Sequence, residues 1–334
     1  MKYFWSVVAV LLAAAGAVSL KPSLLGDHAL GTPFAQIIAL RGVIAVAFIA
    51  AALFLGIFSI IRYKLVNRGR IAAALAVAWL AIGVAHGAVI FDRGTNNPGT
   101  FNGDRDPNAI TLLTYNTLGG ETRPQELADL VVKEGIDVIA LPETSTQRGV
   151  ELVAILKEHG LDFQQFDTST SEYEAEFTST VLLVSTELGE YKQLPGLHQT
   201  GSVVAEPLNG KGPQFIAVHP IAPQPGGIME YWRAQITEVY GLCDGSRDRI
   251  ILGDFNSTAD HQALLNSSCT DAGNEAKVAG LGTWPIGLPA LLASPIDRVL
   301  TDGGKWVGID GALVQIGSSD HRGLMVRLAP ASQG

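Results

Sequence analysis

Residues 249–256 read Arg-Ile-Ile-Leu-Gly-Asp-Phe-Asn, a short apolar run that ends in a glycine, a carboxylate and an amide. Such a run predicts a strand buried in a sheet, because strands covered on both faces are nearly continuous in Val, Ile and Leu. Polar side chains at the end of a strand lie at the edge of its sheet, where catalytic groups are commonly presented. Asp254 and Asn256 are therefore candidate site residues, although either could be an ordinary turn residue.

Polar residues flank other apolar runs of the chain in the same way. These residues are Asn116, Glu143, His219, Asp297, Asp320 and His321. Taken singly, each of them fits a turn. Together with the first pair they form the ordered series Asn, Glu, His, Asp-x-Asn, Asp, Asp-His, which unrelated turns would rarely produce.

The chain from residue 109 onward alternates short β-rich runs with helical patterns, so the sequence predicts an α/β domain. Strands are predicted over residues 109–115, 136–141, 180–184, 202–206, 214–218, 249–253, 298–301, 312–316 and 324–328. One helix is predicted after Thr122, which would cap it, with Pro124 in its first turn. Two more are predicted over 147–158 and 228–239, the second with Trp232 on its apolar face.

The segments that carry the polar series resemble those of the endonuclease/exonuclease/phosphatase superfamily, which includes DNase I-like nucleases, inositol polyphosphate phosphatases and bacterial sphingomyelinases. They are Thr114–Asn116, Leu141–Glu143, Val218–Pro220, Gly253–Asn256, Ile296–Arg298 and Ser319–His321. One departure is Pro142, where the family usually has Gln before the Glu. The resemblance implies a four-layer α/β/β/α sandwich of two mixed sheets flanked by helices, with these segments converging at one edge.

The resemblance implies a metal site, and the chemistry of the residues agrees with it. Glu143, with help from Asn116, suits Mg²⁺ or Mn²⁺, because hard cations prefer carboxylate and amide oxygens. Asp320 would contact the same ion or a second one.

The resemblance also implies catalytic roles for the remaining residues. Asp254 would orient and deprotonate the attacking water, with Asn256 beside it. His321 would contact the phosphoryl group as an imidazolium that Asp297 holds in place, and His219 would protonate the leaving oxygen. The implied reaction is hydrolysis of a phosphoester.

Other ionisable residues of this region are expected to be structural. His159, His198 and His261 have no matching partner in the motifs and are predicted to be solvated surface groups. Asp260 and Asp271 are predicted to be helix-cap or turn residues.

The first 100 residues differ in charge from the rest of the chain. They contain eight Lys or Arg and two Asp or Glu, whereas residues 101–334 contain fifteen and thirty, so the formal charges are +6 and −15. Nucleic acid remains a possible partner, but the acidity of this region disfavours broad binding of nucleic acid, which usually needs a basic face.

Three apolar stretches near the start of the chain are each long enough for a transmembrane helix, at about residues 4–20, 34–61 and 71–91. The first stretch could instead be a cleaved signal peptide, but two further spans favour its retention. The sequence thus predicts a membrane anchor over residues 1–92, a linker over 93–108 and a catalytic domain over 109–330.

The basic residues of the loop 62–70 predict the orientation of the anchor. The loop contains four Lys or Arg and no acid, so it should stay in the cytoplasm and leave the catalytic domain outside the cell membrane. Arg41 and His86 lie inside the spans. Arg41 is expected to reach the outer interface and His86 lies near the outer end of its helix, so we interpret neither as a functional group. Cys243 and Cys269 are either a disulfide, which an oxidising outer compartment favours, or two separate buried thiols.

The layout of three membrane helices followed by an outer domain is similar to that of the teicoplanin-resistance membrane proteins of actinobacteria, which are thought to act on polyprenyl pyrophosphate lipids. Hydrolysis of a lipid-linked phosphate or pyrophosphate is therefore the leading hypothesis. An extracytoplasmic nuclease or sphingomyelinase-like phosphodiesterase is the alternative, and a non-catalytic receptor or scaffold is a third. The apolar loop 283–293 before Asp297 is either core or a contact with the membrane interface.

Overall fold

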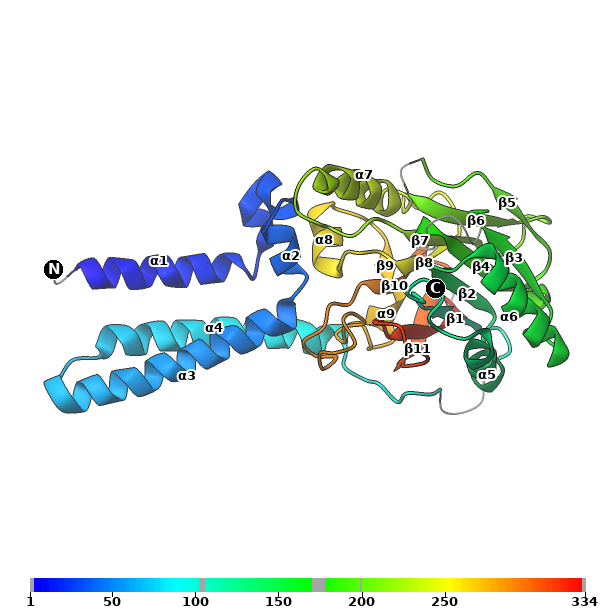
Figure 1. Ribbon diagram of the computed structural model, residues 1–334. Coiled ribbons are helices and arrows are strands. Elements are labelled where there is room, and N and C mark those ends of the chain that lie inside the picture. Colours follow the sequence, from blue (N-terminus) through cyan, green and yellow to red (C-terminus); the bar gives the residue numbers. More distant parts are fainter. Residues whose placement is uncertain (1–2, 102–105, 170–177, 199, 332–334) are drawn as a thin grey trace.

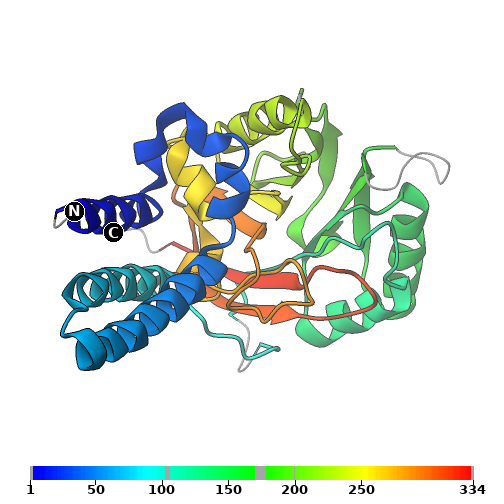
Figure 2. The ribbon, with the colours of Figure 1, turned by 60° about the vertical axis from the view of Figure 1, so that its left-hand side comes forward.

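The computed structural model describes residues 3–101, 106–169, 178–198 and 200–331, so residues 102–105 of the predicted linker lie outside the described part. Figure 1 shows two sheets packed against each other, with helices on their outer faces. Long N-terminal helices leave the domain on one side, next to its yellow and orange segments, in both Figure 1 and Figure 2. The predicted α/β fold with two sheets and flanking helices is confirmed.

Each sheet has six strands and mixes parallel with antiparallel pairs. The first contains β1 (Ile110–Thr114), β2 (Val138–Pro142), β3 (Phe163–Asp167), β4 (Thr180–Ser185), β11 (Trp306–Val314) and β12 (Gly323–Pro330). The second contains β5 (Tyr191–Leu194), β6 (Gly201–Pro207), β7 (Gln214–His219), β8 (Arg249–Asp254), β9 (Thr270–Asp271) and β10 (Asp297–Asp302). The strand orders are β11-β12-β1-β2-β4-β3 and β5-β6-β7-β8-β10-β9. The sequence does not predict β3, β5 and β9, because these short edge strands are only partly buried and lack a clear apolar pattern.

The apolar core lies between the sheets, and a further cluster covers each outer face. Leu112 and Val299 are fully buried members of the central core. On the outer face of the first sheet, α5 (Pro124–Glu134) and α6 (Thr146–Glu158) bury an apolar stripe. On the outer face of the second sheet, α7 (Ile228–Tyr240) buries Trp232 completely.

The start of α5 corrects one prediction. Its N-cap residue is Arg123, whose side chain accepts no hydrogen bond from the first turn. Thr122 is buried one residue earlier, where its hydroxyl lies 2.9 Å from that of Tyr115. The proline at position 124, rather than a capping hydroxyl, therefore starts this helix.

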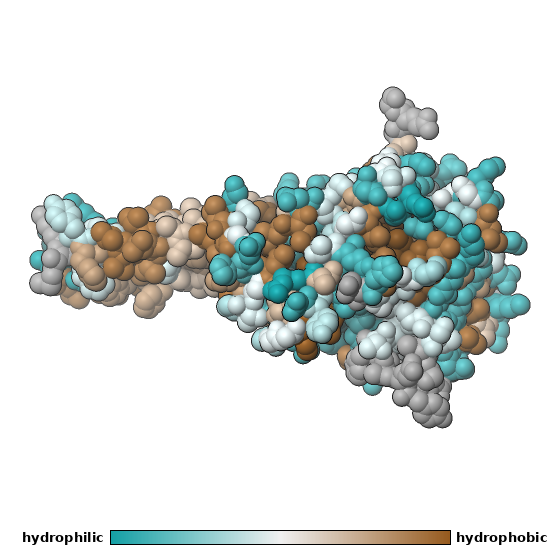
Figure 3. Space-filling model, turned by 90° about the horizontal axis from the view of Figure 1, so that it is seen from above, coloured by the Kyte–Doolittle hydropathy of each residue, from teal (hydrophilic) through white to brown (hydrophobic). Residues whose placement is uncertain are grey.

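The N-terminal part consists of α1 (Phe4–Val18), the 3₁₀ helix η1 (Pro22–Leu30), α2 (Phe34–Ile38), α3 (Arg41–Val66) and α4 (Arg70–Arg93). By length and composition α3 and α4 could each cross a membrane, and α1 with η1 passes the same test as a pair bent by 67°. Figure 3 shows apolar side chains over the long helices and hydrophilic ones over much of the domain. The predicted span 34–61 is divided, because Leu40 leaves the helical conformation between α2 and α3.

Buried ion pairs join the domain to these helices. Asp260 lies in α8 (Ala259–Leu264) and is only 8% exposed. Its carboxylate accepts hydrogen bonds from Arg41 at 3.0 and 2.5 Å and from Arg93 at 3.0 and 2.7 Å. The prediction of a cap or turn role for Asp260 is wrong, and Arg41 is buried against this carboxylate instead of reaching out to solvent. Both errors arise because the partners lie 219 residues apart in the sequence.

His261 belongs to the same contact, so the prediction that it is a solvated surface group is also wrong. Its ring is 1% exposed, and Nε2 donates a hydrogen bond to the Ala35 carbonyl at 3.0 Å. Burial lowers the pKa of His261 to about 4, so the ring is neutral at neutral pH. His159 and His198 are exposed, as predicted.

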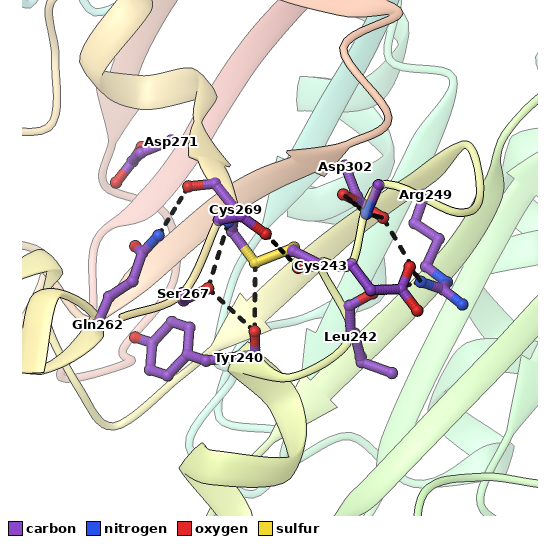
Figure 4. Close-up of a disulfide and its surroundings, with 12 residues drawn as sticks. Tyr240, Leu242, Cys243, Arg249, Gln262, Ser267, Cys269, Asp271 and Asp302 are labelled. Carbon is purple, nitrogen blue, oxygen red and sulfur yellow. Dashed lines mark hydrogen bonds and ion pairs between the residues drawn. A yellow bond between two sulfur atoms is a disulfide. The ribbon is translucent and has the colours of Figure 1, made fainter. Parts of the chain in front are cut away.

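Cys243 and Cys269 form a disulfide, with their Cα atoms 5.0 Å apart (Figure 4). The bond ties the segment after α7 to the segment before β9. Two residues later Asp271 caps α9 (Ala272–Glu275), as predicted, and also pairs with Arg298 at 2.8 Å. This corner of the second sheet is therefore held by a covalent bond and by buried charge.

Replacing Cys243 and Cys269 together with Ser should lower the free energy of unfolding by about 3 kcal/mol, because the disulfide restricts the unfolded chain. Chemical denaturation of detergent-solubilised protein, followed by Trp fluorescence, measures the change. Dithiothreitol should shift the wild-type transition in the same direction and leave the double variant unaffected. Equal transitions for the wild type and the double variant would contradict the prediction.

Replacing Asp260 with Asn should lower the free energy of unfolding by about 3 kcal/mol or more at pH 7, because two largely buried guanidinium groups lose their carboxylate. Although burial opposes it, the two arginines hold the pKa of Asp260 below its ordinary value of 3.8. The stabilisation is therefore complete above pH 3.8 and is lost as the pH falls further through the folded-state pKa. Thermal unfolding measures the effect, and Asp129→Asn at an exposed carboxylate of α5 is the matched control; similar losses in both variants would argue against the ion pairs.

Candidate active site

The candidate site lies where strands of both sheets end. Since β1 and β2 are parallel, Asn116 and Glu143 just beyond them lie at the same edge of the first sheet. Asp254 and Asp297 are direct partners in the antiparallel pairing of β8 with β10, in the second sheet. Asn116 links the two edges, because its Nδ2 donates to Glu143 Oε1 at 2.9 Å and to Asp254 Oδ2 at 3.2 Å.

His321 lies between two carboxylates. Its Nδ1–H donates to Asp297 Oδ2 at 2.8 Å, and its Nε2 is 3.7 Å from Asp254 Oδ2. Burial disfavours the charged ring, but the two carboxylates outweigh burial and raise the pKa of His321 to about 10. His321 is therefore an imidazolium at neutral pH.

His219, unlike His321, is the neutral histidine of the site. Its Nε2 lies 3.7 Å from Glu143 Oε1 and 3.9 Å from Asp254 Oδ2. Burial lowers the pKa of His219, with His321 acting in the same direction and Asp254 against it. The ring is therefore neutral at neutral pH, and it can serve as an acid only after an anionic group has raised its pKa.

The backbone fixes the turn that follows β8. Gly253 has φ 153°, and a Cβ atom there would lie 2.0 Å from the Val218 carbonyl oxygen, so a larger residue does not fit. Asn256 adopts a left-handed conformation with φ 45°, which Asn tolerates better than most residues. Its backbone N–H donates to Asp254 Oδ1 at 2.8 Å, and its Nδ2 donates to the Pro220 carbonyl at 2.9 Å. The turn thus sets the direction of the Asp254 carboxylate.

Glu143 is also held in a left-handed conformation, with φ 54°, which is uncommon for a residue with a side chain. Its backbone N–H donates to the Ser179 carbonyl and its carbonyl accepts from the Thr117 hydroxyl, both at 2.8 Å. Burial raises the pKa of Glu143; the hydrogen bond from Asn116 opposes this shift, and the Asp254 charge adds to it. A cation at this position would stabilise the ionised form of Glu143.

Two groups of residues could hold a divalent cation. Glu143 Oε2 and Asp320 Oδ1 are buried and accept no hydrogen bond from the residues that the structure describes, so a cation would satisfy them. Asp254, Asp297 and His321 also offer ligand atoms within 4.8 Å of one another. The second group is less suitable, because His321 is protonated and already donates Nδ1–H to Asp297.

The structure brings all the residues predicted for the site into one site cluster, linked by contacts of 4.0 Å or less. Its members are Asn116, Glu143, His219, Asp254, Asn256, Asp297, Asp320 and His321. Four acidic side chains and one imidazolium leave a negative excess, which attracts cations. A carboxylate base, an imidazolium and cation ligands side by side can activate water against a group that gains negative charge.

Two further residues of the site are not predicted by the sequence. Trp284 Nε1 donates to Asp320 Oδ2 at 2.8 Å, and its ring centroid is 6.4 Å from that of His321. Ser319 donates its hydroxyl to the Asn116 carbonyl at 2.7 Å. The signals available were the position of Trp284 in the apolar loop before Asp297 and the place of Ser319 in the Ser-Asp-His segment.

The chain is similar to known proteins in both sequence and structure. The model of the Endonuclease/Exonuclease/phosphatase family matches residues 113–321. D. rerio TDP2 humanized by 14 mutations has a TM-score of 0.51 at 15% identity, with coverage of 66% of this chain and 99% of that chain. D. rerio TDP2 complexed with a single strand DNA product has a TM-score of 0.51 at 16% identity, with coverage of 67% and 99%. An endonuclease/exonuclease/phosphatase from Beutenbergia cavernae DSM 12333 has a TM-score of 0.51 at 14% identity, with coverage of 67% and 72%.

At these identities the solved structures show a shared fold alone, and a comparison with curated proteins finds no match. The family model carries more weight, because residues 113–321 make up more than half of the chain and include the whole site cluster. Members of this family are hydrolases of phosphoester bonds, and their dependence on divalent metal ions is general. The chain belongs to the endonuclease/exonuclease/phosphatase family.

Proposed function

We propose that the protein is a membrane-anchored, metal-dependent phosphoesterase that hydrolyses a phosphate or pyrophosphate ester of a lipid-linked substrate at the outer face of the membrane. The observation that carries this proposal is one loop, residues 283–295, which contacts both the site cluster and the N-terminal helices. At one end of the loop Trp284 bonds to Asp320. At the other end Ser294 donates its hydroxyl to the Ala39 carbonyl at 2.8 Å, just before α3.

The loop offers apolar surface between these two contacts. Trp284 is 39% exposed and Leu291 is 45% exposed, although the ends of the loop are buried and belong to the core. Gly42 of α3 lies so close to the loop that a Cβ atom there would be 1.9 Å from the Leu291 carbonyl oxygen. A lipid that leaves the membrane beside α3 would therefore meet apolar side chains on its way to the site cluster.

In this proposal Glu143 and Asp320 hold Mg²⁺ or Mn²⁺, and Asn116 orients Glu143. A bound cation supplies neutralisation of the charge on the phosphoryl oxygens. Two features support this assignment. The first is the pair of buried carboxylate oxygens that accept no hydrogen bond within the described chain. The second is the raised pKa of Glu143, which burial causes and the charges of Asp254 and Asp320 increase, because a cation would relieve both effects.

The remaining residues of the cluster would position the water and move protons. Burial and the neighbouring Asp297 raise the pKa of Asp254, which makes it a better base for the attacking water. Asn256 holds that carboxylate through its backbone N–H. His321 would donate Nε2–H to the phosphoryl group, where negative charge develops. His219 would take up a proton once the phosphate is bound and pass it to the leaving oxygen.

The proposed orientation places the site outside the cytoplasm. The loop 62–70, at the end of α3 and α4 remote from the domain, carries four basic residues and no acid, which favours the cytoplasmic side. The Cys243–Cys269 disulfide fits an oxidising compartment. We propose that α1 forms a third span beside α3 and α4, with residues 1–92 as the anchor and 109–330 as the catalytic domain.

A nuclease or another phosphodiesterase could use the same residues, and the fold is shared with D. rerio TDP2, which was solved with a single strand DNA product. The formal charge of −15 on residues 101–334 argues against broad binding of nucleic acid. The second candidate therefore differs from the first in substrate and not in chemistry, so a direct comparison of substrates separates the two.

Detergent-purified protein should release phosphate from undecaprenyl pyrophosphate in the presence of Mg²⁺ or Mn²⁺ but not of EDTA, and should leave sphingomyelin and plasmid DNA intact. Asp254→Asn should slow the release by about 10³-fold, because it removes the base. His159→Asn changes an exposed imidazole and should keep the wild-type rate.

Other outcomes of this assay have distinct meanings. Nicking of DNA or cleavage of sphingomyelin that Asp254→Asn abolishes would establish the phosphodiesterase alternative. Lipid hydrolysis that is unchanged in Asp254→Asn would show that the site cluster does not carry the reaction. Binding of the lipid without metal and without hydrolysis would favour a non-catalytic receptor or scaffold.

Replacing Asp297 with Asn should lower the pKa of His321 from about 10 toward its ordinary value of 6.5, because one of the two carboxylates that stabilise the imidazolium is removed. In the wild type the ring should stay protonated to above pH 9, whereas the variant should lose activity at a lower pH on the alkaline side. NMR titration of the histidine ring nitrogens in EDTA measures the shift directly. Asp129→Asn is the control, and an unchanged titration of His321 in Asp297→Asn would contradict the assigned ion pair.

A further inference from the structure

A cavity separate from the site cluster lies among the N-terminal helices. Its volume is about 360 Å³, within the range of sites that bind small ligands. Apolar side chains of α1, η1, α2 and α3 form most of its lining, among them Val18, Leu25, Phe34, Ile37, Ile38 and Ile44. The polar part of the lining consists of Ser19, Arg41 and His86. The cavity thus combines a long apolar wall with one cationic end.

A chain of hydrogen bonds fixes the polar residues. Arg41 Nη1 donates to His86 Nδ1 at 3.0 Å, so the ring hydrogen of His86 lies on Nε2 and points to Ser19 Oγ at 2.9 Å. Ser19 Oγ donates in turn to the Gly16 carbonyl at 2.6 Å. The chain joins α1, α3 and α4 and holds the Arg41 guanidinium against the cavity.

The charged side chains next to the polar end of the cavity carry an excess of one positive charge. Arg41 and Arg93 carry two positive charges and share one carboxylate, Asp260, while the three side chains are only 10%, 16% and 8% exposed. Each oxygen of Asp260 already accepts two hydrogen bonds. Within the described ranges, no other acidic side chain pairs with either arginine. A largely buried net charge of +1 is unfavourable unless an anion compensates it.

The position of Arg41 and Arg93 suggests which anion compensates the excess positive charge. Arg41 begins α3 and Arg93 ends α4, so both lie at the domain end of the two helices. In the proposed anchoring this end would lie at the level of the lipid phosphates. Arg binds phosphate through charged hydrogen bonds, and the apolar wall beside Arg41 suits a hydrocarbon chain.

We propose that this cavity binds one anionic phospholipid, with a hydrocarbon chain along the apolar wall and the phosphate toward Arg41. This lipid site is distinct from the site cluster, because the two share no residue. The inference rests on the proposed membrane anchoring but not on hydrolysis. A lipid bound there contacts α1, α2 and α3 together and braces the anchor beneath the catalytic domain.

Native mass spectrometry of the full-length protein tests the proposal. Detergent-purified protein is incubated with equal amounts of phosphatidylglycerol and phosphatidylcholine, and the lipid retained by each protein molecule is identified. The wild type should retain one phosphatidylglycerol, with a preference of about fivefold over phosphatidylcholine. Arg93→Gln should remove this preference, because Arg41 and Asp260 then balance each other.

A second pair of variants tests the cavity itself. Ile37→Trp fills the cavity and should lose retention of either lipid, whereas Ile57→Trp, at an exposed apolar position of α3 outside the cavity, should retain lipid like the wild type. Asp254→Asn should also bind lipid normally, which separates this proposal from the proposed hydrolysis. Equal retention of the two lipids by the wild type, or full retention by Ile37→Trp, would overturn the proposal.

Discussion

The pairing of β8 with β10 places two buried carboxylates, Asp254 and Asp297, directly opposite each other. Two negative charges so close together and so deeply buried repel each other, and His321 is the cation that relieves this repulsion. One imidazolium does not also balance Glu143 and Asp320, so the cluster keeps the negative excess that favours a metal ion. The register of β8 and β10 therefore accounts for the proposed base and its imidazolium partner, whereas Glu143 and Asp320 from the other sheet add the negative excess.

The segment 254–260 connects the site cluster with the attachment of the domain to the N-terminal helices. Asp254 ends β8, Thr258 caps α8 and Asp260 lies in the first turn of that helix. Only five residues thus lie between the proposed base and the carboxylate that holds Arg41 and Arg93. A movement of the N-terminal helices relative to the domain would displace α8. The buried cap residue of α8, Thr258, would pass this displacement to the turn that orients Asp254. The attachment and the site thus share one short segment of the chain.

The site cluster could be predicted from local sequence patterns, but the contact between the domain and the N-terminal helices could not. Each residue of the site cluster stands next to an apolar run, so its place at a sheet edge follows from the strand itself. The pairing of Arg41 with Asp260 spans 219 residues and has no local signal, and for this reason His261 and Asp260 are misread as surface or cap residues. Trp284 is intermediate, because its apolar loop is visible in the sequence while its hydrogen bond to Asp320 depends on the folded loop. The charge state of His219 also requires the structure, since burial determines it.

In the proposed orientation, a strongly acidic domain stands beside a membrane surface that often carries negative charge itself, and the two would repel each other. A flexible tether would allow the domain to move away. The buried ion pairs of Asp260, together with contacts such as that of Ser294 with Ala39, oppose this movement, because they join the domain directly to the N-terminal helices. In the proposed function, this attachment would keep the site cluster near the membrane surface, where the phosphate of a lipid-linked substrate lies.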